Sequence, residues 1–141
     1  MIARMTTLKR LARCGAGAAI LEFALLAPVF LMMLFGIIEF SRLAWTRQTL
    51  DEVAFSTARC MSVETSCGTT DMQRSYAISR AADYGIALSA ANVTISGNAS
   101  CNGYGASNTV TISKSFASPA KGLIPALPDE VTSSACFPVL G

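Results

Sequence analysis

The chain has 141 residues, of which 52% are hydrophobic, so it has room for one modest domain and a membrane anchor. It contains no histidine, which excludes Ser-His-Asp and Cys-His catalysis and every imidazole metal ligand. Its net charge of +2 comes from 11 basic and 9 acidic residues, and four of the basic ones lie within the first 17 residues. The rest of the chain therefore lacks the basic face that nucleic-acid binding requires, and we expect no nucleic-acid partner.

The basic N-terminal segment is followed by a long apolar one. The positive charges are Arg4, Lys9, Arg10 and Arg13, with no acid among them. Residues 18–38 read AAILEFALLAPVFLMMLFGII. At about 1.5 Å per residue this helix would extend about 31 Å, which matches the hydrocarbon core of a bilayer. The apolar part of a secretory signal peptide is shorter and ends in a small-x-small cleavage site, so a retained transmembrane helix is predicted.

The charge distribution also predicts an orientation. Under the positive-inside rule the basic segment 1–17 stays in the cytoplasm, and everything after Ile38 lies on the opposite, oxidising side. Arg42 and Trp45 would then lie near the outer interface, which suits an indole and a snorkelling guanidinium.

Glu22 is the single charged residue of the apolar segment. A carboxylate at the centre of a membrane helix costs about 2.5–3.5 kcal/mol on insertion scales, so its presence calls for an explanation. One interpretation places it near the headgroups, snorkelling or protonated. The other comes from its spacing, because a cut after Gly17 would make Ala18 the first residue, Glu22 the fifth and Phe23 the sixth. The new amine at Ala18 could then pair with Glu22 of the same or a neighbouring chain.

A basic leader ending in glycine, followed by four mostly apolar residues, Glu and an aromatic, resembles a prepilin peptidase site. The core EFALLAP from Glu22 to Pro28 and the sequence GIIEF from Gly36 to Phe40 are similar to those of the TadE-like pseudopilins of tight-adherence, or Flp-type, pilus systems. The resemblance covers residues 13–50.

The resemblance implies a role for each part of this segment. Gly17 and Ala18 would form the cleavage site, while Glu22 and Phe23 would serve peptidase recognition and helix register. The chain would be a single-pass protein of the bacterial inner membrane with a periplasmic C-terminal domain. Its implied partners are the prepilin peptidase, other pilin or pseudopilin subunits and the inner-membrane assembly platform. It would be the substrate of an enzyme and not itself an enzyme.

Residues 39–60 are predicted to continue the helix as an amphipathic segment that ends at about Arg59. Apolar residues recur there at three-and-four spacing, which is the pattern of one buried helix face. The members of this stripe are Phe40, Leu43, Ala44, Leu50, Val53 and Ala54. We expect the stripe to pack against the domain that follows.

Residues 61–141 are predicted to form a small domain with a second helix and an antiparallel sheet of about three strands. Thr70 or Asp71 would cap the helix, which would run through Tyr84 and end at Gly85. The residues expected to be buried on it are Tyr76, Ile78, Ala81 and Ala82. Alternation predicts strands around Val93 and Ile95 and around Val110 and Ile112, a loop over Gly97–Asn108, and a final edge strand over Val131–Phe137. The fold class is α+β and pilin-like.

The cut after Gly17 would remove Cys14 and leave an even set of four cysteines. These are Cys60, Cys67, Cys101 and Cys136, which allow three disulfide connectivities. Spacing favours Cys60 with Cys67 and Cys101 with Cys136. A four-thiolate zinc site is the alternative, but the chain has no Cys-x-x-Cys knuckle, so no metal or cofactor is expected.

The predicted function is structural: a minor pilin-like subunit or an assembly factor of a tight-adherence pilus. One alternative is an uncleaved single-span envelope protein whose outer domain binds a ligand or partner. The other is an extracytoplasmic enzyme that uses carboxylates alone, for which Asp51 with Glu52 and Asp129 with Glu130 are the candidates. Adjacent residues on a helix point in different directions, so these pairs are interpreted as solvated surface, and no catalytic residue is assigned.

Overall fold

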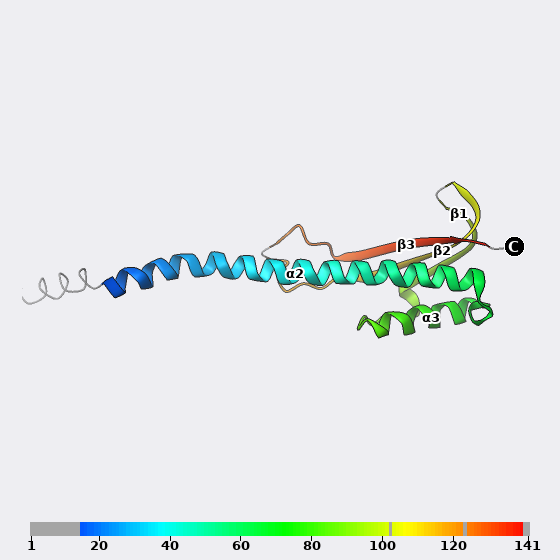
Figure 1. Cartoon of the computed structure of the whole chain (residues 1–141), viewed down its shortest axis with the longest axis horizontal. Coiled ribbons are helices and arrows are strands. Elements are labelled where there is room, and N and C mark those ends of the chain that lie inside the picture. Colours follow the sequence, from blue (N-terminus) through cyan, green and yellow to red (C-terminus); the bar gives the residue numbers. More distant parts are fainter. Residues whose placement is uncertain (1–14, 102, 123, 140–141) are drawn as a thin grey trace, which may run out of the picture. The chain divides into compact units, whose positions relative to one another are not determined.

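The computed structural model describes residues 15–101, 103–122 and 124–139. The chain divides into two compact units, Met1–Glu39 and Phe40–Gly141. The elements are α2 (Gly15–Val63), the short 3-10 helix η1 (Thr65–Cys67), α3 (Thr70–Asp83), a second 3-10 helix η2 (Ala90–Asn92), and the strands β1 (Val93–Cys101), β2 (Tyr104–Ser115) and β3 (Glu130–Pro138) (Figure 1). The expected α+β class is confirmed, with a long N-terminal apolar helix, a second short helix and a three-stranded antiparallel sheet.

The described part of the first unit is the apolar beginning of α2. Its Ala, Leu, Met and Phe residues are sterically compatible with a helix, which continues through Pro28. The side chains from 18 to 35 are exposed apart from that of Ala27, which is half-buried, and Phe23, for example, is 73% exposed. Within the described residues, α2 is the one helix that contains an 18-residue segment apolar enough to cross a membrane, with a mean hydropathy of 2.4. Exposed apolar surface of this extent is the mark of a segment that meets lipid or another protein.

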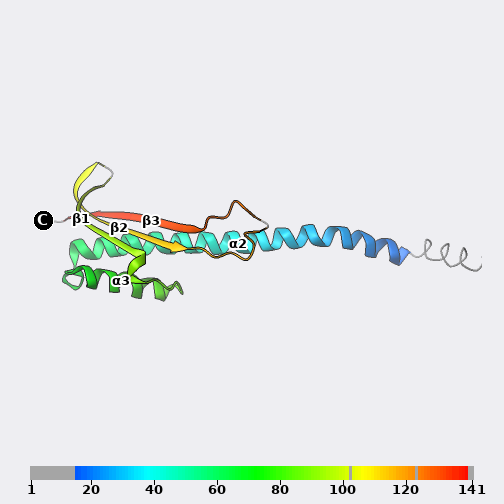
Figure 2. The ribbon, with the colours of Figure 1, turned by 180° about the vertical axis from the view of Figure 1, so that it is seen from behind.

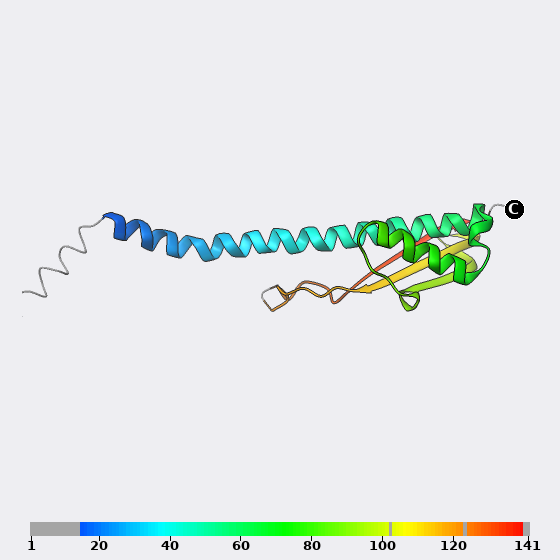
Figure 3. The same ribbon diagram turned by 90° about the horizontal axis from the view of Figure 1, so that it is seen from below.

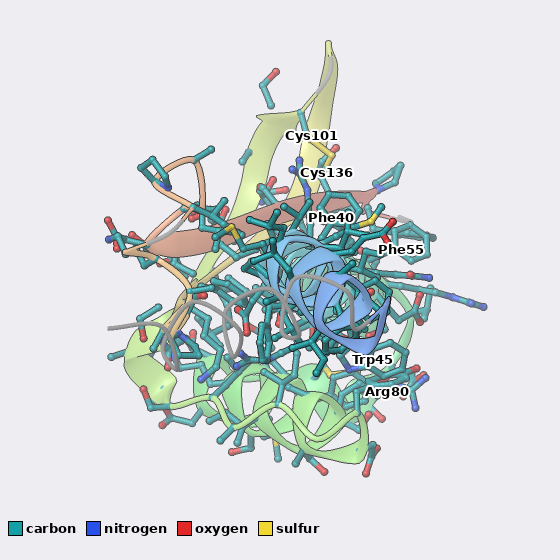
Figure 4. The ribbon with its side chains drawn as sticks, turned by 90° about the vertical axis from the view of Figure 1, so that its left-hand side faces the viewer. Phe40, Trp45, Phe55, Arg80, Cys101 and Cys136 are labelled. Carbon is teal, nitrogen blue, oxygen red and sulfur yellow. A yellow bond between two sulfur atoms is a disulfide. The ribbon has the colours of Figure 1, made fainter. Side chains whose placement is uncertain are left out.

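The core of the second unit lies between the sheet and the C-terminal part of α2, with α3 on the other side of that helix (Figures 1 and 4). Leu50, Val53 and Ala54 are fully buried, as the stripe predicts, and Thr57 and Ala58 continue it. Side chains at this three-and-four spacing share one helix face, so they form a continuous contact with the sheet and α3. The helix ends at Val63, four residues later than predicted.

The beginning of the predicted stripe is wrong. Phe40 is 68% exposed and Ala44 is exposed, while Leu43 is half-buried. Leu43 still packs against the core, whereas Phe40 and Ala44 do not, and all three side chains line an open groove with Pro128 and Val131. The apolar period therefore continues beyond the point where the sheet and α3 enclose the helix.

α3 differs from its prediction at its start and on one face. The N-cap is Thr69, not Thr70 or Asp71: its side chain accepts a hydrogen bond from the backbone N–H of Met72 at 3.3 Å. The prediction of Ala82 as a buried residue is wrong, because Ala82 is exposed and Ala77 is buried with Ala81. Alanines at these positions let α3 come close to its neighbours, since they have no side chain beyond Cβ.

The burial of Tyr76 and Ile78 and the end of α3 agree with the prediction in part. Tyr76 and Ile78 are half-buried, which is less than predicted. Tyr84 is the C-cap, and Gly85 follows with a φ of +77°, a left-handed conformation that glycine adopts without a Cβ penalty.

The sheet has the order β1-β2-β3, with both pairings antiparallel. β2 and β3 pair without interruption from Ser107 opposite Pro138 to Ser115 opposite Glu130. The face toward α2 carries the apolar members of the alternation, Val93, Val110, Ile112 and Val131, all buried. Hydroxyls occupy the other face, where Thr111 contacts Ser134 at 3.0 Å and Ser113 contacts Thr132 at 2.8 Å. Such cross-strand pairs help to fix the register.

The predicted loop over Gly97–Asn108 is wrong. β1 continues to Cys101 and β2 begins at Tyr104, so most of this polar segment is strand. Two register shifts interrupt the pairing of β1 with β2, and Asn98 and Ala106 have positive φ values of 53° and 52°. Bulges of this kind increase local twist, and the end of the hairpin bends away from the rest of the sheet (Figure 2).

Long-range contacts explain why this polar segment forms strands. Ser107 and Asn108 pair with β3 through their backbones and are buried, at 2% and 8% exposure. The side-chain amide of Asn108 also donates to the hydroxyl of Ser62 on α2 at 2.9 Å. Because the backbones pair with β3 and the Asn108 amide bonds to Ser62, a Gly- and Asn-rich composition does not prevent strand pairing here.

Candidate functional site

The predicted cleavage site lies in the first turn of α2. The helix begins at Gly15, so the peptide between Gly17 and Ala18 is helical and both residues are exposed. Glycine destabilises a helix by about 0.5–1 kcal/mol relative to alanine, so the two glycines make this turn easy to unwind. The basic leader residues 1–14, with Cys14, lie outside the described residues.

The space around Gly17 shows whether the fold itself needs a glycine there. A Cβ built at Gly17 would meet nothing within 4 Å. The fold of the chain itself therefore does not require glycine at this position. Glycine at this position would instead suit a partner that approaches the backbone closely.

Glu22 and Phe23 lie one turn further along the helix, and both are exposed. Glu22 follows Ala18 by four residues, so the two residues share a helix face. A new amine at Ala18 would then lie on the same face as the Glu22 carboxylate, one turn away. The geometry suits the pairing that the sequence suggested.

The first disulfide joins Cys60, near the end of α2, to Cys67 in η1. Both cysteines are buried, at 2% and 1% exposure. The carbonyl of Cys67 also accepts a hydrogen bond from the side-chain amide of Gln73 at 2.8 Å. Together these contacts hold the turn that leads from α2 to α3.

The second disulfide joins Cys101, at the end of β1, to Cys136 on β3 (Figure 4). These strands are not neighbours in the sheet, because β2 lies between them. The bond therefore ties the bent end of the hairpin to the opposite edge strand. Both pairings are those that the cysteine spacing favoured, and they use all four sulfurs that a zinc site would need.

The candidate catalytic carboxylates lie in different environments. Asp51 accepts a hydrogen bond from the hydroxyl of Ser133 on β3, and both Asp51 and Glu52 line an open groove with Trp45 and Tyr84. Asp129 forms an ion pair with Lys121. Within residues 15–101, 103–122 and 124–139, no group of three or more Cys, Asp or Glu side chains could hold a metal ion.

Two contacts of α2 were not found by sequence reasoning. One is the Asp51–Ser133 hydrogen bond, which joins residues far apart in the chain and leaves no local pattern. The other is the guanidinium of Arg42 over the ring of Phe116, at 5.7 Å from its centroid. The sequence did hold a sign of the second contact. Residues 117–128, which follow Phe116, are apolar and rich in proline, and apolar residues outside helices and strands often mark a contact surface.

The comparisons with known proteins concern the N-terminal part of the chain. Residues 17–59 match the model of a family described as TadE-like protein. A search of curated proteins and a search of solved structures gave no match. A match to this family suggests involvement in a tight-adherence pilus system. The resemblance to TadE-like proteins is therefore confirmed, over residues 17–59.

Proposed function

We propose that the protein is a pilin-like subunit or assembly factor of a tight-adherence pilus, matured by a prepilin peptidase. In this proposal residues 1–17 form a cytoplasmic leader and residues 18–38 span the bacterial inner membrane. Residues 39–60 continue the helix, and residues 61–141 form the disulfide-bonded periplasmic domain. The observation that carries the proposal is the family match, which lies on the helix whose apolar side chains are exposed.

Three features support a cut between Gly17 and Ala18. The family match begins at Gly17. The first turn of α2 contains two glycines, and unwinding it costs little. The cut also removes Cys14, which leaves four cysteines in two disulfides and no unpaired thiol to react in an oxidising compartment.

The cut is tested by intact mass spectrometry of the protein extracted from membranes of cells that carry the pilus system. We expect a chain that begins at Ala18. Gly17→Ile should abolish maturation, because a branched side chain would block close approach to the backbone. Gly15→Ile is the matched control and should mature normally. An uncut wild-type chain would contradict the proposal and favour the single-span envelope protein.

Incorporation would depend on Glu22, whose carboxylate would pair with the amine at Ala18 of the same or a neighbouring chain. Neutralising both charges in this way is what makes them tolerable in lipid. Glu22→Val should leave cleavage intact but prevent co-purification with other pilus components. Leu21→Val is the control, since Leu21 is also exposed and carries no charge. Normal co-purification of Glu22→Val would refute this role.

A further inference from the structure

β3 is an edge strand that lacks the usual protection of an edge. It pairs with β2 on one side, and among the described residues no strand lies on its other side (Figure 3). Its register with β2 has no shift, and its one charge and one proline are its first and last residues, Glu130 and Pro138. Charges, prolines and bulges are what normally block an edge, because an open edge is a template for another strand. The opposite edge strand, β1, does carry two register shifts, so the open edge is that of β3.

The alternation of the ladder shows which backbone groups of β3 are unpaired. The N–H of Phe116 donates to the carbonyl of Asp129 at 2.7 Å, and this pair is the next one in the register of β2 with β3. Because bonded residues alternate along an antiparallel ladder, every second residue from 131 to 137 bonds to β2. The N–H and carbonyl groups of Thr132 and Ser134 therefore point away from β2, along the open edge. Both residues are exposed.

One side of α2 runs beside this edge. It carries exposed residues at spacings of three and four, which are Phe40, Ala44, Arg47, Asp51 and Phe55. Asp51 accepts the hydrogen bond from Ser133, and Phe55 packs edge to face against Phe137, with ring centroids 6.0 Å apart. Figure 4 shows Phe40 and Phe55 on the side of α2 nearer the sheet. The helix therefore forms a wall next to the unpaired backbone groups of β3.

The wall and the beginning of β3 enclose an open groove that is mostly apolar. Its lining residues are Phe40, Leu43, Ala44, Arg47, Pro128, Glu130, Val131 and Thr132. By alternation Glu130 directs its side chain to the same face of the sheet as Thr132 and Ser134, away from α2. Arg47 is exposed on the side of α2, and its guanidinium forms no ion pair with another described residue. An occupant of the groove would therefore meet apolar side chains and one unpaired positive charge.

We propose that the open edge of β3 and this groove together bind an extended strand of another protein. An extended backbone presents donors and acceptors at the spacing of the unpaired groups of Thr132 and Ser134. The side chains of the added strand alternate between two environments. Those on the side of α2 are apolar, with one acid beside Arg47, and those on the other side are polar and meet the hydroxyls of Thr132 and Ser134. The proposal depends neither on the cut after Gly17 nor on how α2 meets a membrane.

The first test measures amide exchange in the full chain, isotope-labelled for NMR in detergent micelles. The probe is a synthetic nine-residue peptide with valine at odd positions, threonine at even positions and glutamate at the centre, so it reads the same in both strand directions. Without peptide we expect fast exchange at Thr132 and Ser134 and slow exchange at Ser133 and Ala135. Saturating peptide should slow Thr132 and Ser134 by at least about tenfold. Slow exchange of these two amides without peptide, or no change on its addition, would overturn the proposal.

Two methylated peptides show whether backbone pairing holds the probe. One carries N-methyl groups on two valines and the other on two threonines, so each loses N–H groups along one side of the strand only. Both have the same composition, which controls for partition into the micelle. We expect one peptide to bind like the parent and the other to lose binding, and the one that fails also tells whether the added strand is parallel or antiparallel. If the two bind equally well or equally poorly, no strand is added to β3.

Arg47→Glu tests the charge of the groove. It should weaken binding of the parent peptide about two- to fivefold, and a peptide with lysine at the centre should restore the affinity. Arg59→Glu is the matched control, because Arg59 is exposed on the same helix but lines a different groove, and it should leave the affinity unchanged. Near-ultraviolet circular dichroism checks that both variants fold. Equal weakening by the two variants would mean that net charge sets the affinity, and the placement of the acid beside Arg47 would be wrong.

Discussion

The hydroxyl of Ser133, on the edge strand β3, donates a hydrogen bond to the carboxylate of Asp51 on α2. Ser133 is 4% exposed, whereas Asp51 is exposed, so the bond joins a buried donor to a carboxylate that keeps contact with water. This polar contact joins β3 to the helix beside the buried Leu50 and Val53.

Removing the acceptor should therefore destabilise the domain. Asp51→Ala leaves the Ser133 hydroxyl buried without a partner, which costs about 1–3 kcal/mol. The measurement is the free energy of unfolding of the full chain in detergent micelles, followed by near-ultraviolet circular dichroism. Glu52→Ala, which removes the neighbouring exposed carboxylate, should change it by less than about 0.5 kcal/mol. Equal losses from the two variants would mean that the hydrogen bond contributes nothing.

The disulfides differ in the length of chain that they close, 7 residues apart for Cys60–Cys67 and 35 for Cys101–Cys136. In the chain-entropy model the shorter loop contributes about 2.5 kcal/mol and the longer one about 4 kcal/mol. We expect Cys101→Ala with Cys136→Ala to lower the melting temperature more than Cys60→Ala with Cys67→Ala. The opposite order would show that packing of the buried Cys60 and Cys67 outweighs loop closure.

The oxidised state of the cysteines has a direct chemical test. The protein is extracted from membranes, unfolded and alkylated without reductant, and labelled thiols are then located by mass spectrometry. No label is expected on Cys60, Cys67, Cys101 or Cys136, and reduction before alkylation should label all four. Label at any of them in the unreduced sample would contradict the pairing.

Local periodicity was sufficient to predict the parts of the fold that depend on nearest neighbours. The three-and-four spacing of Leu50, Val53 and Ala54 predicted a buried helix face, and the alternation at Val110 and Ile112 predicted a half-buried strand. In both cases one apolar face repeats with the period of the element that carries it. The apolar segment, with its Glu22, pointed to the TadE-like family from local sequence alone.

Long-range contacts explain the predictions that were wrong. The polar segment around Asn108 forms strand because its side chain bonds to Ser62, 46 residues away, and no local pattern encodes that contact. Phe40 continues the apolar period of the stripe but is exposed, because periodicity does not tell where the sheet and α3 stop covering the helix. The choice of cap failed for a different reason, since adjacent threonines have nearly equal capping ability.

The cap of α3 can be tested at two adjacent threonines. Thr69 accepts a hydrogen bond from the N–H of Met72, whereas Thr70 is the first residue inside the helix. Thr69→Ala should cost about 1 kcal/mol of unfolding free energy, because it leaves an N–H of the first turn without its partner. Thr70→Ala should be close to neutral. A larger loss from Thr70→Ala would move the start of the helix by one residue.

The alanines of α3 offer the sharpest test of its packing. Ala77 and Ala81 are fully buried, and they lie one turn apart on the same face. Ala81→Leu adds three carbon atoms to a packed contact and should cost about 1–3 kcal/mol. Ala82→Leu adds the same atoms to the next residue, which is exposed, and should change stability by less than about 0.5 kcal/mol. Thermal unfolding of both variants measures the difference. If Ala82→Leu proved to be the more damaging change, α3 would be rotated so that the face carrying Ala82 meets the domain, and the burial of Ala82 expected from the sequence would be correct.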